Sequence, residues 1–403
     1  MTISDDQPLK GMRICVLVNN DTYRDSRVKK ECAALAEAGA HVTVVGFGDT
    51  YPGDTNVLPY RLMLVRPSEF PAWYVNLGRE TVFYPLRVAV NLSLRPYFRR
   101  TFASVHSSII KAVQGEGFDI IHANDFDMLE TGALLAKRNK AKLVYDSHEI
   151  FLAPGRWKFK PSVQEKFERD EERLFQRVDK LVTVNPKIGE YLSARYNSTV
   201  ETVSIYNGST ARVADATPTH MPMRVLFLGI FQKFFNFPEL ISQMERFRGK
   251  LELTLQGYGG EESAIEEAIK ANDLQDFIRV VPPVDTFSIV SSSKSYDLGI
   301  INTEVDNLNL EMCSPNKFFD YLSAGLGVIA SDQQTFIASV IKDTGCGFSY
   351  NQQRPEDLFI ALDYLIAHPD EVSEMKRKAL ATASRFSWDV QKAKLVELYS
   401  SLR

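Results

Sequence analysis

The chain has 403 residues, 44% of them hydrophobic and 24% charged, with a formal net charge of −4. This length and apolar content suffice for two globular domains with substantial cores. The mild acidity argues against a general nucleic-acid binder, so no nucleic-acid partner is expected. Nor does any apolar run approach the roughly 18 residues that a spanning helix needs.

The cysteines and the first residues of the chain indicate the cellular compartment in which the protein is expected. Cys15, Cys32, Cys313 and Cys346 are scattered and form no CxxC pair, which fits reduced thiols in a cytoplasmic protein. The segment MTISDDQPLKG is polar and acidic, unlike a signal peptide. We therefore expect a cytoplasmic protein without a cysteine metal framework.

The first half of the chain alternates short β-rich runs with helical patterns, which is typical of parallel α/β architecture. MRICVLVN at 12–19 predicts a strand, followed by a helix at 25–39 that ends at a glycine. Further strands are predicted at 41–47, 118–124, 141–148, 179–185 and 200–208.

Residues 211–223, ARVADATPTHMPM, interrupt this pattern. The segment is polar, contains prolines and has no period, so it predicts a linker. The alternation then restarts with strands expected at 224–230, 251–259, 277–284, 296–302 and 327–331. The sequence thus predicts two doubly wound α/β domains. Ligands of such sheets bind beyond the carboxyl ends of the strands, so a cleft between the domains is expected.

The stretch SPNKFFDYLSAGLGVIASD at 314–332 predicts a helix running into a strand. Ser314 suits the N-cap, Pro315 the first helical position and Gly325 the position just past the end, so the helix is expected at 315–324.

Lys317 lies in the first turn of this helix, where the partial positive charge of the helix end disfavours a cation. A phosphate bound at the free N–H groups of that turn would make the lysine a ligand. Asp320, one turn on, is placed to accept hydrogen bonds from hydroxyls. The other interpretation is an ordinary capped helix with a solvated lysine, and the residues alone do not separate the two.

The same stretch resembles the donor-binding segment of glycosyltransferases with the GT-B fold, especially the large retaining family four. Many members read S-P-x-K-x-x-E-Y-x-A-x-G-x-P-V-I-A-S. Asp320 stands for the family glutamate and Gly327 for the family proline. Further resemblance covers nearly the whole chain, in NNDTYRDSRVKKECAALAEAGAHVTVV (19–45), HANDFDML (122–129), VYDSHEIF (144–151) and FSWDVQKAKLVELY (386–399).

This resemblance implies a fold class of two Rossmann-like domains facing a cleft. Residues 1–212 would bind the acceptor, 213–385 the nucleotide sugar, and 386–403 would form a helix crossing back to the N-terminal domain. The implied activity is transfer of a sugar from a nucleoside-diphosphate sugar to a hydroxyl acceptor, such as a polysaccharide, glycolipid or lipid-linked saccharide. Retention of configuration and independence of metals are expected as well, with no cofactor beyond the donor substrate.

The resemblance also implies roles for single residues on the donor side. Lys317 would neutralise the leaving diphosphate, with backbone at Ser314, Pro315 and Asn316 against the phosphates and Asp320 on the ribose. Glu311, with eight residues between it and Asp320, is the candidate for the sugar contact, the alternative being a surface acid. His148 in YDSHE is the other candidate catalytic residue, and Gly257 belongs to a G-x-G turn like that of relatives.

One departure from the family concerns its G-R-x5-K-G motif. The arginine position is Ile230 and the lysine position is Phe235, in GIFQKFFNFPEL (229–240). Lys233 is the nearby cation and is assigned to phosphate binding, the alternative being a solvated loop lysine.

Residues of the N-terminal half are candidates for the acceptor side. Asn20, Asp25, Arg27 and Glu149 lie at expected strand ends, although Asp25 also suits a helix cap. Asp125 and Asp127 form a D-x-D, which in another glycosyltransferase fold binds a metal. Here Asp127 is expected to cap a helix at 128–138 and no metal is predicted.

Residues 81–105 hold four arginines among apolar side chains and no acid. They suit either peripheral contact with the inner face of an anionic membrane or a basic rim on a helix pair. Two rival functions remain on this fold. One is a nucleotide-sugar epimerase, and the other is a catalytically silent subunit that scaffolds an active partner, as the replaced cations at Ile230 and Phe235 would allow.

Overall fold

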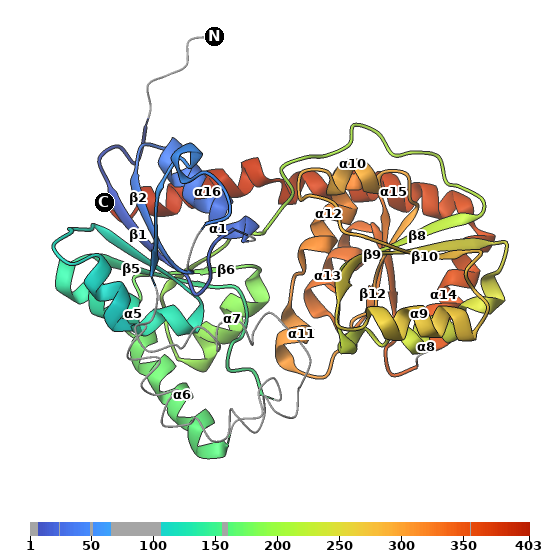
Figure 1. Cartoon of the computed structure of the whole chain (residues 1–403), viewed down its shortest axis with the longest axis horizontal. Helices are drawn as coiled ribbons and strands as arrows, with labels where there is room; N and C mark the ends of the chain where they lie inside the picture. The colour runs from blue at the N-terminus through green and yellow to red at the C-terminus, as the bar shows by residue number, and fades with distance from the viewer. Residues whose placement is uncertain (1–6, 24, 49–50, 66–105, 155–159, 355) are drawn as a thin grey trace, which may run out of the picture.

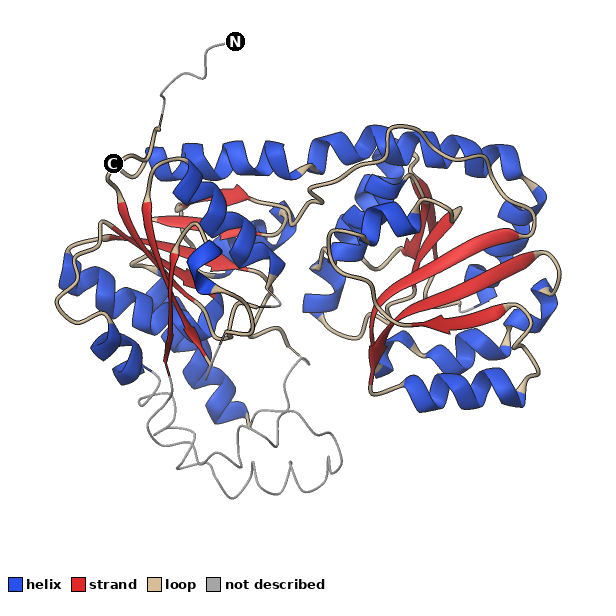
Figure 2. Ribbon diagram, turned by 45° about the horizontal axis from the view of Figure 1, so that its top comes forward, coloured by secondary structure: helices blue, strands red, loops and turns tan. Residues whose placement is uncertain are grey.

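The computed structural model describes residues 7–23, 25–48, 51–65, 106–154, 160–354 and 356–403. Within them the chain forms two parallel β-sheets, each covered by helices on both faces (Figures 1 and 2). Residues 205–222, which contain no helix or strand, connect the last strand of the first sheet to the first strand of the second. The fold class is therefore the one predicted, two doubly wound α/β domains.

The first sheet has the order β3-β2-β1-β4-β5-β6-β7, with every pair parallel. Its order reverses between β1 and β4, and such a switch point opens a crevice at the carboxyl ends of the strands. The strands are β1 (Arg13–Leu17), β2 (His41–Phe47), β3 (Arg61–Val65), β4 (Ile120–Asn124), β5 (Lys142–Ser147), β6 (Lys180–Thr183) and β7 (Glu201–Ser204).

Alternate residues of these strands supply two hydrophobic cores, because successive side chains of a strand point to opposite faces. In β1, Ile14 and Val16 pack on one face and Cys15 and Leu17 on the other. The first face is covered by α1 (Ser26–Glu37) and α16 (Trp388–Ser400), and the second by α5 (Asp125–Asn139), α6 (Pro161–Phe175) and α7 (Pro186–Arg195).

The second sheet has the order β10-β9-β8-β11-β12-β13, again with every pair parallel. Its strands are β8 (Met223–Phe231), β9 (Leu251–Gly259), β10 (Ile278–Val281), β11 (Leu298–Ile301), β12 (Gly327–Ser331) and β13 (Gly347–Tyr350). One face packs on η2 (Lys233–Phe235), α8 (Phe237–Ser242), η3 (Met244–Phe247), α9 (Glu262–Ala271) and α14 (Glu356–Ala367).

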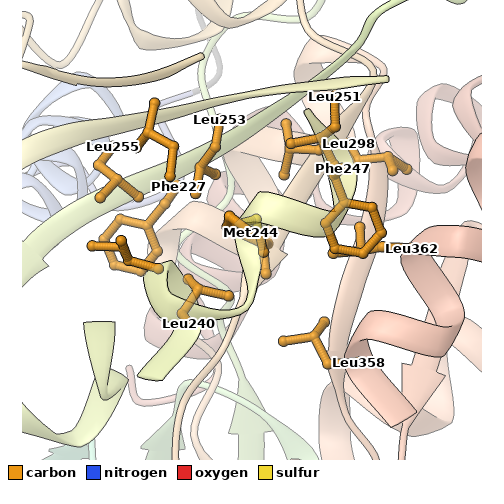
Figure 3. Close-up of a cluster of buried hydrophobic side chains, with 14 of the residues drawn as sticks. Phe227, Leu240, Met244, Phe247, Leu251, Leu253, Leu255, Leu298, Leu358 and Leu362 are labelled. Carbon is orange, nitrogen blue, oxygen red and sulfur yellow. The ribbon is translucent and has the colours of Figure 1, made fainter. Parts of the chain in front are cut away.

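Figure 3 shows the core on that face, where Phe227 and Leu255 of the sheet meet Leu240 and Met244. The opposite face packs on α10 (Ile289–Ser293), α12 (Asn316–Ala324), α13 (Thr335–Thr344) and α15 (Pro369–Phe386). The short helix α11 (Leu308–Met312) lies between the two sheets in Figure 1.

The last helix confirms the expected return to the N-terminal domain. Helix α15 packs on α12 in the second domain, and after a break at Ser387 the chain continues as α16 along α1 (Figure 1). Trp388, Leu395, Leu398 and Tyr399 are buried in the core of the first domain. The two domains are thus joined by two chain crossings rather than one.

Each predicted strand is present with small changes in its ends, and two further strands were not predicted. These are the edge strands β3 and β13, whose residues are mostly only partly buried. Among the residues that the structure describes, no helix is both long and apolar enough to cross a bilayer. The basic segment 81–105 lies outside the described residues, so its membrane interpretation stays a prediction.

Close contact between β8 and β9 explains the glycine at position 257. The two strands pair in register over Gly229 and Gly257, and a Cβ built on Gly257 would lie 1.8 Å from the carbonyl oxygen of Gly229. Packing of two backbones therefore requires this glycine, whatever its part in ligand binding.

Gly257→Ala is expected to lower the free energy of unfolding by about 1–3 kcal/mol or more, because the added methyl group must push the strands apart. Urea denaturation measures this change. Gly260→Ala is the matched control, since nothing lies within 4 Å of a Cβ built there. Equal stability of the two variants would contradict the packing argument.

Candidate functional site

A cavity of about 480 Å³ lies where the carboxyl ends of the first sheet's strands meet the segment between α11 and α12. Most of the residues that line it are polar. The first half of the chain contributes Asn20, Asp21, Asp25, Ser26, Arg27, His148, Glu149, Val184 and Asn207, and the second half contributes Asn309, Cys313, Ser314, Pro315 and Asn316. Eight residues assigned from the sequence line it: Asn20, Asp25, Arg27, His148, Glu149, Ser314, Pro315 and Asn316.

Asparagines connect the two walls of this cavity. The amide of Asn185 donates to the carbonyl oxygen of Met312 at 2.7 Å, and the amide of Asn207 donates to Oδ1 of Asn316 at 2.8 Å. In the other direction, Oδ1 of Asn309 accepts from the backbone N–H of Ile150 at 2.9 Å. These bonds hold the N-terminus of α12 against the first domain.

Helix α12 begins one residue later than predicted. Asn316 is its first residue, Pro315 occupies the N-cap position and no side chain caps the helix, so the assignment of Ser314 as N-cap is wrong. The reason is that Ser314 Oγ faces the other domain, where it donates to the carbonyl oxygen of Val184 at 3.3 Å. Gly325 ends the helix in a left-handed conformation with φ of 72°, as expected.

The side chain of Lys317 does not line the cavity but is buried behind it. Nζ lies 3.7 Å from the centroid of the Phe227 ring and 4.3 Å from that of Phe235, and it has no hydrogen-bond partner among the described residues. A Cβ built on Gly229 would lie 3.2 Å from Nζ, so the glycine leaves room for the ammonium. Burial lowers the pKa of Lys317 to about 7.

Asp320, one turn along α12, faces a cation from the other domain. Burial raises the pKa of its carboxyl group to about 7, and the charge of Lys30 on α1 opposes this rise. Lys30 Nζ donates to the carbonyl oxygen of Gly208 at 2.8 Å and lies 5.0 Å from the centroid of the Trp388 ring. Asp320 is therefore held between the domains, close to the point where α16 crosses.

His148 follows β5 and lies between two carboxylates. Its Nδ1 is 3.3 Å from Oδ2 of Asp125, and its Nε2 is 3.2 Å from Oδ2 of Asp146. Burial lowers the pKa of His148, but the two carboxylates outweigh this effect and hold the pKa well above its ordinary value. The imidazole is therefore a cation at neutral pH, at the wall of the cavity.

Arg27 is a buried residue at the edge of the cavity, and its guanidinium group bonds groups of the protein itself. It bonds both carboxylate oxygens of Asp146, at 2.9 and 3.2 Å, and donates to the carbonyl oxygen of Ile205. Glu31 lies 3.0 Å from the same group. Arg27 was assigned to acceptor binding from the sequence; the structure places it at the cavity, with its charge paired to protein carboxylates.

The loop after β1 places Asn20 and Asp25 at the cavity. Oδ1 of Asp25 accepts from the backbone N–H of Val28, so Asp25 is the N-cap of α1, the alternative noted from the sequence. Asn20 donates to Asp25 at 2.9 Å.

The start of α5 differs from the prediction. The carboxylate of Asp127 accepts from the side-chain amide of Asn19, and α5 begins at Asp125, so the expectation that Asp127 caps a helix at 128–138 is wrong. Asp127 therefore lies within the first turn of α5 rather than at its cap, and Asp125, the first residue of the helix, has a left-handed φ of 58°.

Besides Lys317 and Asp320, three residues assigned to the site do not line the cavity. Glu311 is on α11, where its carbonyl oxygen accepts from Thr335 Oγ1, and its carboxylate is not among the lining groups of the described residues. Lys233 is exposed on η2, and Gly257 is buried between β8 and β9. Phe235, at the family's lysine position, packs against Lys317 instead of presenting a charge.

Residues 26–210 match the sequence model of Glycosyltransferase Family 4, and no curated protein matches the chain. Solved structures resemble it over 97% of its length. Sucrose-phosphate synthase from Thermosynechococcus elongatus has a TM-score of 0.75 at 17% identity, with 99% of that chain covered. Anabaena HepE, solved with UDP and glucose, has a TM-score of 0.66 at 15% sequence identity, with 100% of that chain covered. The lipopolysaccharide outer core galactosyltransferase WaaB has a TM-score of 0.64 at 13% sequence identity, also with 100% of that chain covered.

The chain has the GT-B fold. The match to the glycosyltransferase family model lies in the first domain, and the structural likeness extends over both domains, as the resemblance in the sequence implied. Sequence reasoning missed Asn185, Asn207 and Asn309, which join the two walls of the cavity. Each lies at or near the end of a strand or the start of a helix, but nothing local distinguishes it from a turn asparagine.

The charge state of His148 is testable through Asp125. Asp125→Asn keeps an oxygen that accepts from the His148 backbone N–H, a bond of 2.9 Å in the structure, and removes one of the two facing charges. Loss of this opposite charge is expected to lower the pKa of His148, because the imidazolium is then stabilised by Asp146 alone. Histidine NMR titration measures it, with exposed His368 as reference; an unchanged His148 pKa would refute the two-carboxylate account.

Asp320 is expected to weaken the folded state above neutral pH. An acid whose folded pKa is raised loses stability as pH climbs from the unfolded value, near 4, to the folded value. Asp320→Asn should therefore raise the melting temperature at pH 8 by at least about 2 °C, with a smaller gain at pH 5. Exposed Asp276→Asn is the control, and a gain independent of pH would contradict the burial argument.

Proposed function

We propose that this glycosyltransferase moves a sugar from a nucleoside-diphosphate sugar to a hydroxyl of a saccharide or lipid-linked saccharide, with retention of configuration and without a metal. The observation that carries the proposal is the cavity between two doubly wound domains, with the N-terminus of α12 on one wall. The amides of a helix's first turn have no partner within the helix and favour an anion.

The composition of the wall supports a hydroxyl-rich acceptor. Asn, Ser, Asp and Glu side chains from the first domain face the N-terminus of α12 across the cavity. Such groups bind hydroxyls by paired donation and acceptance, as a saccharide requires. Retention would follow when acceptor and leaving group share one face of the sugar, and the leaving phosphate would then help to deprotonate the acceptor.

Independence of metals is proposed from the chemistry of the acidic groups. Glu31, His122 and Asp146 offer ligand atoms within 4.8 Å of one another, but the Arg27 guanidinium already binds the two carboxylates. In the D-x-D, Asp125 pairs with His148 and Asp127 accepts from Asn19. Each acid thus has a protein partner, which supports a phosphate site built on helix amides and a lysine.

A thermal-shift panel of UDP, GDP, dTDP and ADP with EDTA tests the donor site. Binding to the folded state alone raises its stability by RT ln(1 + [L]/Kd), about 2.7 kcal/mol at a hundredfold excess over Kd. One nucleotide is expected to raise the melting temperature, and Lys317→Ala to shrink the shift. Exposed Lys270→Ala is the matched control.

No shift at millimolar concentration of any of the four nucleotides would contradict the proposal and favour a scaffold subunit. When one nucleotide binds, the matching nucleotide sugar is incubated with and without a saccharide acceptor. Transfer or slow hydrolysis supports the proposal, whereas an isomerised free nucleotide sugar would identify an epimerase.

A further inference from the structure

The ammonium of Lys317 has no anion near it, which is unusual for a buried cation. Buried charges are normally paired, because an isolated ion loses its hydration without compensation. Here Nζ is enclosed by the rings of Phe227 and Phe235 and by Gly229, and no oxygen of the described residues bonds it. We call Phe227, Gly229 and Phe235 the aromatic seat of Lys317.

The titratable groups around the seat supply little charge. Cys313, just before α12, would raise the pKa of Lys317 if its thiol were ionised. Burial raises the pKa of that thiol to about 11, so the thiol is neutral at pH 7 and supplies no charge. Asp320 lies on the same helix but is opposed by Lys30. The exposed Lys233, on the same turn as Phe235, adds no negative charge.

The seat itself is rigid. Phe227 is fully buried and Phe235 nearly so, and their ring centroids lie 4.9 Å apart at 78°, an edge-to-face pair. Phe227 also packs on Phe237 at 4.9 Å, and Figure 3 shows it among the leucines of the core. Ring faces attract an ammonium, but more weakly than full hydration does.

We infer that Phe227 and Phe235 are positioning residues that seat Lys317 without a counter-ion, so that the donor's diphosphate is its first anionic partner and donor binding takes up a proton from solvent. This inference rests on the proposed function and specifies its phosphate site. The proton balance is simple: the fraction of neutral amine in the free enzyme gains one proton from buffer, and the ammonium then pairs with the diphosphate.

The lowered pKa of Lys317, about 7, sets the pH range. Below pH 7 the free enzyme already carries the ammonium, and donor affinity is independent of this group. Above pH 7 protonation must accompany binding, so the affinity is expected to fall by roughly tenfold for each pH unit. An ordinary lysine, with a pKa near 10.4, would leave the affinity constant over this range.

The test is calorimetric titration with UDP-glucose, or with the glucose derivative of whichever base the nucleotide panel selects, between pH 6.5 and 8.5. The diphosphate of a nucleotide sugar has no group that titrates there. At pH 8 the binding heat, compared among buffers of different ionisation enthalpy, is expected to show uptake of about one proton.

Lys317→Arg is the decisive variant, because a guanidinium keeps its proton throughout this range. The affinity of this variant for the nucleotide sugar is expected to be constant with pH, whatever its absolute value. A small pH dependence that remains would come from titration of Asp320. Lys270→Arg, the same change on the exposed face of α9, should behave as the wild type.

Wild-type affinity that is constant with pH would overturn the inference while leaving the proposed donor site intact. Equal pH dependence in wild type and Lys317→Arg would overturn it as well, since another group would then titrate. Failure of every nucleotide sugar to bind at any pH would overturn both the inference and the proposed function.

Discussion

The ion pair between Arg27 and Asp146 connects most of what surrounds the cavity. Arg27 comes from the first turn of α1 and Asp146 from the end of β5, and both side chains are buried. Burial raises the pKa of Asp146, but Arg27, His148 and His122 outweigh it and hold that pKa well below its ordinary value. Breaking such a pair would leave an uncompensated buried charge, which is far more damaging than never having the pair.

Neighbouring groups extend this pair in two directions. Toward the cavity, Asp146 holds His148, so the charge at the wall depends on a pair beneath it. Toward the C-terminus, His122 lies 3.6 Å from Asp146 and its Nδ1 is 2.5 Å from the hydroxyl of Tyr399 on α16. The last helix and the cavity wall are therefore linked through four side chains, those of His148, Asp146, His122 and Tyr399.

Local patterns were enough to predict the architecture, because buried parallel strands read as continuous apolar runs and the helix ends carry glycine or proline signals. The edge strands β3 and β13 were missed because they are short: β3 has only the apolar run LMLV at 62–65, and β13 is the four residues GFSY. For the site, Pro315, Asn316 and His148 were predictable from strand and helix ends. The aromatic seat of Lys317 was not predictable, because in the sequence Phe235 looks like any core phenylalanine. Only the structure shows its ring beside the ammonium.

The crossing of α16 has a consequence for how the polypeptide matures during synthesis. The core of the first domain includes Trp388, Leu395 and Leu398, which lie almost two hundred residues beyond β7. A nascent chain emerging from the ribosome can pair β1 to β7, yet one face of that sheet is covered only by α1, without α16, until the second domain has been translated. Domains usually fold in order as they emerge. Here the first domain to be made is the last to be completed.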